Sequence, residues 1–257
     1  MNVGISMSAT PGLTDFAAVA QKIEELGFDS VWLPEHPVIP VNHNTKYAGT
    51  PDGSIPIPMT LGVNPLIALA TAASATENLG LGTAVNLITE HNPIDLAKQI
   101  STLDFYSGGR FMFGIGTGWF REESEIMGAD FDHRWTQARE HVMAMKELWT
   151  KDQAEFHGRY VDFPPVRCNP KPAQKPHPPV WFGGRHPDAL RRAVRYGDGW
   201  MGAGSSTTDQ FKQCVATIQE TMETAGRDPA SFPISKRVYL AMDDDEARAE
   251  RRLREWF

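Results

Sequence analysis

The sequence predicts a (β/α)8 barrel, and three observations lead to this fold class. Short apolar segments that suit buried strands alternate with segments of helical periodicity along the chain. Glycine, asparagine and proline mark the changes from one kind of segment to the other. The length of 257 residues is also that of one such barrel. A doubly wound open sheet is the alternative, because it is built from the same alternation.

The clearest strand–helix–strand unit runs from Asn78 to Glu123. Residues 79–87 form an apolar run with interior glycines, typical of a strand buried on both faces. Asn92 can cap the next helix, whose apolar residues recur on one face at Ile94, Ala97, Ile100 and Leu103. A glycine pair can end this helix before a second buried strand at 111–115. Two strands joined in this way pair in parallel through a right-handed crossover.

Two strands and two helices are expected before this unit. Residues 3–7 and 30–33 suit short strands, and Thr14 can cap the helix between them. Residues 37–63 have no clear periodicity and are rich in proline, glycine and asparagine. A loop this long in a compact domain is expected to be a functional lid or to be disordered. A helix from 64 to 76 then leads into the central unit.

Three more strands are expected after the unit. The proline-rich residues 163–179 predict an extended connector and not an element. The other elements expected are, in order, a helix from Trp135 to Trp149, a strand at 180–182, a helix from Pro187 to Gly197, a strand at 200–201, a helix from Thr207 to Gly226, a strand at 235–242 and a charged helix from Asp243.

Seven strands therefore alternate with seven helices, and the eighth strand of a barrel is lacking before Trp256 and Phe257. An unclosed edge would leave main-chain groups unpaired, and an apolar end is unusual. We expect residues 1–257 to form a single barrel domain that is incomplete at its C-terminal end. The natural chain is then expected to continue past Phe257, unless something else closes the gap.

Composition and charge exclude several classes of function. The net charge of −7 and the absence of lysine or arginine runs argue against a nucleic-acid partner. No apolar segment is long enough to span a membrane. Cys168 and Cys214 lack metal-ligand spacing, no histidine pair has such spacing, and no signal peptide is evident. The sequence thus predicts a cytoplasmic protein with no metal site.

In a (β/α)8 barrel the ligand site lies at the carboxyl ends of the strands. The residues expected there are Glu35, His36, Ala84, Val85, Asn86, Thr117, Gly118, Trp119, Gly183, Gly184 and Arg185. Together they have the chemical types needed for a phosphate-bearing cofactor with a flat ring. Residues 114–118 lack the third glycine of a dinucleotide loop, and no G-x-S-x-G elbow is present.

Two of these groups can be interpreted in more than one way. Residues 183–185 precede a helix, so backbone N–H groups, the helix N-terminus and Arg185 could bind a phosphate. The same pattern also suits an ordinary turn with a surface arginine. His36 could exchange a proton with a ligand, because histidine ordinarily titrates near neutral pH. A hydrogen-bonded structural histidine is the alternative.

Four segments carry a resemblance to a known family: GFDSVWLPEH (27–36), residues 79–119, PHPPVWFGGR (176–185) and YGDGWM (196–201). In this order and spacing the chain resembles the luciferase-like monooxygenase superfamily of flavin and deazaflavin oxidoreductases. The sequences GTGWFREE and WLPEH are most similar to the subgroup that depends on coenzyme F420, a deazaflavin.

The resemblance implies a barrel with the cofactor ring at its mouth. It implies a non-proline cis peptide at Ala84–Val85 that props the ring, and phosphates bound by residues 183–185. It also implies that Glu35 and His36 lie beside the ring, with the histidine as a proton-transfer group. Trp119 stands where some deazaflavin relatives carry a glutamate, so their sugar-phosphate dehydrogenase activity does not transfer directly.

The expected function is hydride transfer between coenzyme F420 and a small organic substrate held under the 37–63 loop. An FMN-dependent monooxygenase that uses molecular oxygen is the first alternative. A non-catalytic flavin-binding protein is the second, and loss of the acid at Trp119 would suit it. Relatives often dimerise through barrel helices, so a homodimer is expected.

Overall fold

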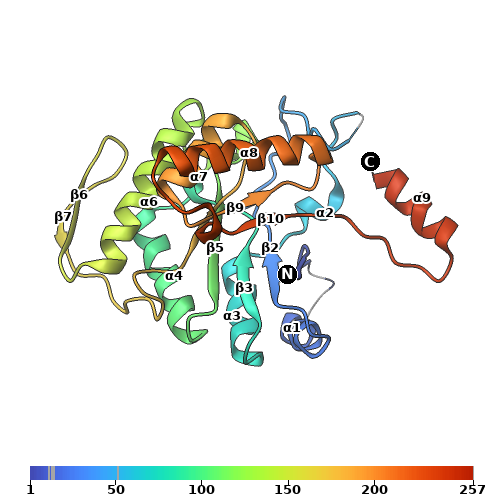
Figure 1. Ribbon diagram of the computed structural model, residues 1–257, viewed down its shortest axis with the longest axis horizontal. Helices are drawn as coiled ribbons and strands as arrows, with labels where there is room; N and C mark the ends of the chain where they lie inside the picture. Colours follow the sequence, from blue (N-terminus) through green and yellow to red (C-terminus); the bar gives the residue numbers. More distant parts are fainter. Residues whose placement is uncertain (11, 13–14, 51, 257) are drawn as a thin grey trace.

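A curled, parallel β-sheet surrounded by helices forms the body of the protein (Figure 1). The computed structural model describes residues 1–10, 12, 15–50 and 52–256. The strands of the sheet are β1 (Gly4–Ser6), β2 (Ser30–Leu33), β3 (Gly80–Thr83), β4 (Asn86–Leu87), β5 (Phe111–Gly116), β8 (Val180–Phe182), β9 (Gly199–Gly202) and β10 (Ile234–Lys236). Their order is β1-β2-β3-β5-β8-β9-β10, with β4 also paired to β5, and every pairing is parallel. The sheet is of the (β/α)8-barrel type that the sequence predicts.

The barrel is open between its first and last strands. Among the described residues, β1 and β10 are the two ends of the sheet and do not pair with each other. This is the gap that an eighth strand would fill. Continuation of the natural chain past Phe257 stays a prediction, and Phe257 itself lies outside the described residues.

Two tryptophans demonstrate how strongly the sheet curls. Trp32 lies on β2 and Trp181 on β8, which are three steps apart in the sheet, or about 14 Å if it were flat. Their ring centroids are nevertheless 5.8 Å apart, so both side chains meet inside the curl. Gly82 on β3 makes room for them, because a Cβ there would lie 2.2 Å from the Trp32 ring. The alternate residues, such as Val31, face the helices and form the core.

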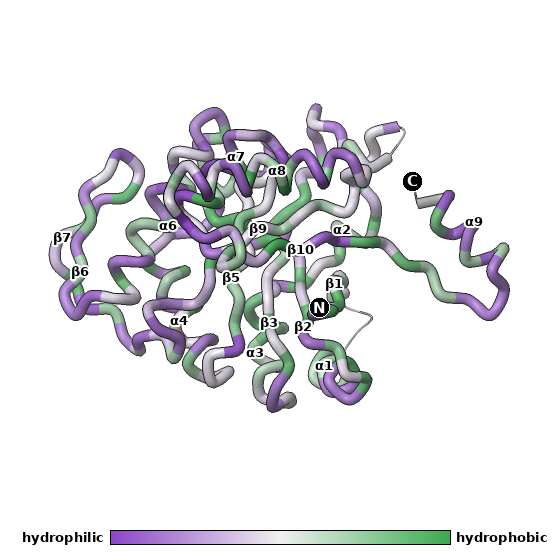
Figure 2. The backbone as a smooth tube through the Cα atoms, in the orientation of Figure 1, coloured by the Kyte–Doolittle hydropathy of each residue, from purple (hydrophilic) through white to green (hydrophobic). Residues whose placement is uncertain are grey.

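Except for the last one, the helices cover the outer face of the sheet (Figure 1). They are α1 (Phe16–Glu25), α2 (Ile57–Thr60), α3 (Pro65–Ala75), α4 (Pro93–Tyr106), α5 (Arg121–Ile126), α6 (Arg134–Thr150), α7 (Pro187–Tyr196), α8 (Thr208–Thr224) and α9 (Glu246–Trp256), with 3₁₀ turns at Ile88–Glu90, Phe131–His133 and Pro229–Ser231. Figure 2 shows apolar residues along the strands and mainly hydrophilic ones on α9. No helix in the described part of the chain is long and apolar enough to cross a membrane.

Several local expectations are confirmed by the helix ends. Asn64 and Asn92 cap α3 and α4 by accepting backbone N–H groups, and Thr207 caps α8. The cap of α1 is Asp15, which accepts from Ala18 N. Thr14, the predicted cap, lies outside the described residues. The α2 and α5 helices have too few turns to produce a periodic signal, so sequence analysis missed both.

The connector predicted for 163–179 is wrong at its start. Residues Ala154–His157 (β6) and Asp162–Val166 (β7) form an antiparallel hairpin. The hairpin lies at the opposite side of the molecule from the C-terminal helix (Figure 1). Pro164 and Pro165 are tolerated because they lie opposite an irregularity in the pairing, where no ladder N–H is needed.

The strand predicted for 235–242 is also shorter than expected. Only β10 pairs, and the chain then runs as an extended arm to α9, which lies apart from the barrel (Figure 1). Val238, Leu240 and Met242 are exposed on this arm. A run of apolar residues becomes a strand only where a neighbouring strand supplies hydrogen-bonding partners. Here β9 pairs with Ile234, Ser235 and Lys236, which include just the first two residues of the predicted strand.

Candidate active site

Three of the predicted groups meet around Val85 at the carboxyl ends of the strands. The side chain of Val85 lies against the backbone of Gly116 and Gly183, where added Cβ atoms would be 2.6 and 3.3 Å from its methyl groups. Gly183 N also donates to Ile115 O at 2.9 Å. The ends of β3, β5 and β8 therefore come together as predicted.

The Ala84–Val85 peptide bond is cis, as the family resemblance implies. This bond separates β3 from β4, so the strand predicted for 79–87 is interrupted there. Ala84 N donates to Leu33 O at 2.7 Å, and Arg237 Nη2 donates to Ala84 O at 3.0 Å. Arg237 is not among the predicted site residues, because it lies in a predicted strand far from Ala84 along the chain.

Glu35 joins the end of β2 to β4. The residue is 4% exposed, and its Oε2 accepts from Asn86 Nδ2 at 2.6 Å and from Leu87 N at 2.8 Å. His91 Nε2 lies 3.0 Å from the same oxygen. These contacts hold Asn86, the residue that directly follows the cis peptide bond. Asn86 Oδ1 is buried and has no hydrogen-bond partner among the described residues.

His36 pairs with an acid that the sequence analysis missed. Its Nδ1 lies 2.7 Å from Glu123 Oε2, and the side chains of His36 and Glu123 are 11% and 0% exposed. Glu123 lies in the first turn of α5, directly after the mouth residues 117–119. The available signal was an acidic run immediately after a buried strand, where a carboxylate can reach the barrel mouth.

A second buried acid lies close to this pair. Glu90, in the 3₁₀ turn after β4, accepts a hydrogen bond from Ser124 Oγ at 2.8 Å. Burial raises the pKa of Glu90 to about 8, and the negative charges of Glu123 and Glu35 act in the same direction. Gly118, at φ +73°, lies against the Glu90 carboxyl, and Thr117 is also buried there.

Trp119 is the centre of a group of rings, called here the aromatic column, that also contains Phe120, Tyr47 and His36. It stacks on Phe120 with ring centroids 5.0 Å apart, and the Tyr47 ring lies 5.2 Å away. The edge-on contact with the His36 ring is 5.9 Å. Because Tyr47 belongs to the 37–63 loop, the column connects this loop to His36.

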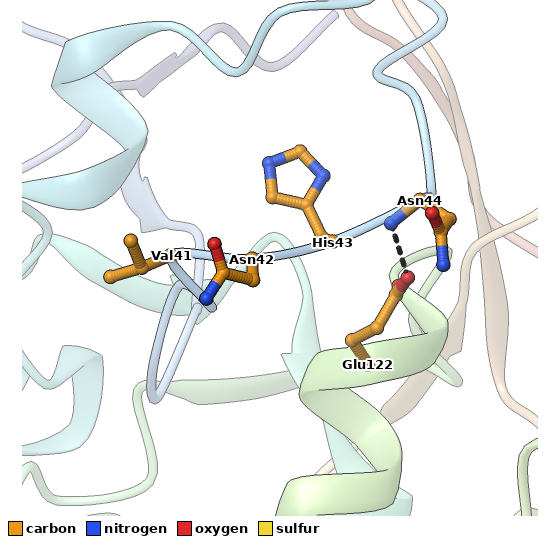
Figure 3. Close-up of a pocket in the computed structure, with 5 residues that line it drawn as sticks. All are labelled: Val41, Asn42, His43, Asn44 and Glu122. Carbon is orange, nitrogen blue, oxygen red and sulfur yellow. Dashed lines mark hydrogen bonds between the residues drawn. The ribbon is translucent and has the colours of Figure 1, made fainter.

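The 37–63 loop is also attached to α5 through Glu122 (Figure 3). The carboxylate accepts from Asn44 N at 2.6 Å and from Thr45 N and Oγ1 at 3.2 and 2.6 Å. These bonds, led by that of the Thr45 hydroxyl, lower the pKa of Glu122 to about 2. A pocket of about 370 Å³ lies at this attachment, lined by Val41, Asn42, His43, Asn44 and Glu122. The loop is thus held at the mouth by several directed contacts.

The predicted phosphate group lies at the start of α7. Gly184 has φ +100°, and its carbonyl accepts from Trp200 Nε1 at 2.7 Å. Arg185 is exposed, and His186 caps the helix. Gly183 is the residue of this group that lies against the Val85 side chain in the contacts described above. In the described part of the chain, no three His, Cys, Asp or Glu side chains are arranged to hold a metal ion.

Comparison with known proteins shows a family relationship over the whole chain. The family described as luciferase-like monooxygenase matches residues 1–257. An uncharacterized protein of Mycobacterium tuberculosis is 36% identical over 214 residues, which are 82% of this chain and 75% of the relative. An F420-dependent glucose-6-phosphate dehydrogenase of Kineococcus radiotolerans is 29% identical over 265 residues, covering 100% of this chain and 72% of the relative.

Solved structures share the fold. A monooxygenase from Streptomyces bottropensis superimposes with a TM-score of 0.83 at 22% identity, covering 99% of this chain and 76% of that one. An F420-dependent secondary alcohol dehydrogenase gives a TM-score of 0.79 at 23% identity, covering 99% and 73%. The family match and the shared fold agree, and the chain belongs to the luciferase-like monooxygenase family.

Proposed function

We propose that the protein is an oxidoreductase that transfers a hydride between coenzyme F420 and a small organic substrate. The observation that carries this proposal is the His36–Glu123 pair, which lies at the same barrel mouth as the cis Ala84–Val85 bond. A buried histidine paired with a carboxylate is suited to proton transfer, the step that must accompany hydride transfer. The relative named as an F420-dependent dehydrogenase, similar over the whole chain, supports the same choice.

The residues at the mouth fit a flat ring with a phosphate-bearing tail. Val85 offers an apolar platform between two glycines, and Asn86 Oδ1 is a buried acceptor without a partner among the described residues. Gly184 and Arg185, at the start of the α7 helix, suit an anion. The proposed cofactor contacts are Ala84, Val85, Asn86, Thr117, Gly118, Trp119, Gly183, Gly184 and Arg185.

The protein's own groups then have separate tasks. When bound, F420 supplies or accepts the hydride. His36 exchanges the accompanying proton with the substrate. The aromatic column around Trp119 excludes water from the His36 ring. Glu35 acts indirectly, through the hydrogen bond that its Oε2 accepts from Asn86. The 37–63 loop, held by Glu122, covers the substrate.

An FMN-dependent monooxygenase is the second candidate. The family description and the structural similarity to a monooxygenase favour it. Flavin and deazaflavin rings have the same shape, so one site could hold either of them. The same platform at Val85 would then carry FMN, and exclusion of water by the loop would protect the oxygen chemistry. The two candidates differ in which cofactor binds and in whether oxygen is consumed.

Cofactor titration tests the choice directly. The seven tryptophans give a fluorescence signal for titration with F420 and, separately, with FMN. We expect saturable quenching by F420 at micromolar concentration and much weaker quenching by FMN. Preference for FMN would overturn the cofactor assignment and favour the monooxygenase. Tight binding without reduction by any dehydrogenase substrate would favour a non-catalytic flavin-binding protein.

A pair of arginine variants locates the binding site. Arg185→Gln removes the cation at the proposed phosphate position, and we expect it to weaken F420 binding about tenfold. Arg191→Gln is the matched control, because Arg191 lies within α7, a few residues after Arg185, but pairs with Asp188 on the helix surface. Equal affinities for the two variants would contradict the proposed phosphate position.

A further inference from the structure

The carboxylate that contacts His36 is buried, and no lysine or arginine among the described residues pairs with it. Glu123 is fully buried, and the His36 ring is its one side-chain hydrogen-bond partner among the described residues. Its second oxygen, Oε1, has no partner in the same part of the chain. Burial of a carboxylate is costly unless a donor compensates it. In the part of the chain that the structure describes, the N–H of the His36 imidazole is the one side-chain donor placed to do so.

We propose that Glu123 is the positioning residue for His36, holding a proton on Nδ1 and so presenting Nε2 to the substrate. The inference rests on the proposed function only in making His36 the proton-transfer group. A carboxylate can only accept, so the 2.7 Å contact requires Nδ1 to be the donor. The neutral ring then carries its lone pair on Nε2, and the charged ring carries a proton on both nitrogens.

This arrangement defines the path of the proton. As the hydride leaves the substrate carbon, Nε2 takes one proton from the substrate, and in the reverse direction Nε2–H returns it. The proton on Nδ1 stays in place throughout, and Glu123 stabilises the imidazolium that forms. The edge-on contact with Trp119 at 5.9 Å limits rotation of the ring, so the hydrogen bond and the aromatic column fix it together.

The surrounding acids leave Glu123 to act alone. Glu90 is the acid whose pKa is raised by the charge of Glu123, in addition to burial. Because this pKa is raised to about 8, Glu90 is mainly protonated at neutral pH. A protonated Glu90 adds no negative charge beside Glu123. Glu35 is the third acid of this region, and its Oε2 is engaged by Asn86, Leu87 and His91. None of these groups competes with Glu123 for the Nδ1 proton.

Nitrogen NMR of the histidine rings tests the inference on the full chain, without added cofactor. We expect the neutral His36 ring of the unmodified protein to carry its proton on Nδ1. Glu123→Ala removes the acceptor, and we expect the proton to move mainly to Nε2. Glu123→Gln keeps an acceptor oxygen but loses the charge, and we expect the Nδ1 proton to exchange with solvent at least about tenfold faster.

Glu125→Gln is the matched control. Glu125 lies on the same helix, but it is exposed and pairs with Arg121. This variant should leave the His36 ring signals unchanged, and unchanged signals of the buried His141 report that each variant is folded. A proton on Nε2 in the unmodified protein would overturn the inference, and so would equal Nδ1 exchange rates in Glu123→Gln and Glu125→Gln. The unmodified protein decides the first point even if Glu123→Ala does not fold.

Cofactor binding separates this inference from the proposed function. We expect Glu123→Gln to keep the F420 dissociation constant of the unmodified protein and to lower kcat, because Glu123 acts through His36. If F420 does not bind but Nδ1 carries the proton, the positioning role holds and the proposed function fails. If F420 binds and Nε2 carries the proton, the proposed function holds and the positioning role fails.

Discussion

Replacement of Glu90 by glutamine should stabilise the protein at neutral pH but not in acid. Glu90 is 3% exposed, and among the described residues its carboxyl has one hydrogen-bond partner, Ser124, with Oε2 left unpaired. Burial, reinforced by Glu123 and Glu35, raises its pKa from 4.5 to about 8. The folded protein therefore keeps a proton that the unfolded chain releases above pH 4.5. This favours unfolding increasingly as the pH rises from 4.5 to 8.

The size of the effect follows from the gap between the two pKa values. Between these two pKa values, each rise of one pH unit lowers the free energy of unfolding by about 1.4 kcal/mol. At pH 7 the carboxyl thus costs about 3 kcal/mol of stability, and close to nothing at pH 4. Glutamine has nearly the same shape, can still accept from Ser124 and does not ionise. Glu90→Gln should therefore exceed the unmodified protein in stability by an amount that grows with pH.

Urea unfolding at pH 5.5, 6.5 and 7.5, followed by tryptophan fluorescence, measures this difference. We expect the advantage of Glu90→Gln to grow by about 2 to 3 kcal/mol between the lowest and the highest of these pH values. Glu125→Gln, which alters an exposed acid, should show no such trend. Parallel stability curves for Glu90→Gln and the unmodified protein would refute the reasoning, because Glu90 would then ionise normally in the folded state.

Two further substitutions test the packing of the site. Gly114→Ala would place a Cβ 1.9 Å from Thr83 O, and we expect a loss of about 3 kcal/mol or more in urea unfolding. Gly62→Ala is its control, since a Cβ there meets no atom closer than 4.0 Å, and a similar loss in both would contradict this account. Glu122→Ala removes the acceptor for the loop amide of Asn44, which should exchange with deuterium several-fold faster while α5 stays protected. Unchanged exchange at Asn44 would show that the aromatic column alone holds the loop.

Local chemistry explains most of what could be predicted about the elements. Asn64 and Asn92 could be recognised as caps because a helix start requires a side-chain acceptor within three residues. The same rule could not separate Thr14 from Asp15, which both qualify. The hairpin of β6 and β7 was missed because its prolines indicate an interruption, and only the pairing register reveals that they fall opposite an irregularity.

The strand ends could be placed at one mouth because parallel strands share a direction. The family resemblance added the cis bond at Ala84–Val85, which the structure contains. Propensity and spacing alone would not have indicated it. By contrast, Arg237 donates a hydrogen bond to the Ala84 carbonyl of this cis bond but lies 153 residues away along the chain. This contact is apparent only in three dimensions.

The sequence by itself determined the alternation of the sheet strands with the longer helices, the caps at Asn92 and Thr207, and the end of the sheet at which the carboxyl ends of the strands meet. These depend on contacts within a few residues and on the common direction of parallel strands. Only the tertiary structure decided that Glu123 contacts His36, 87 residues away, and that Glu90 is buried beside them. Such pairings depend on how far the sheet curls and on where short helices such as α5 begin. The periodicity of a sequence does not encode either of these.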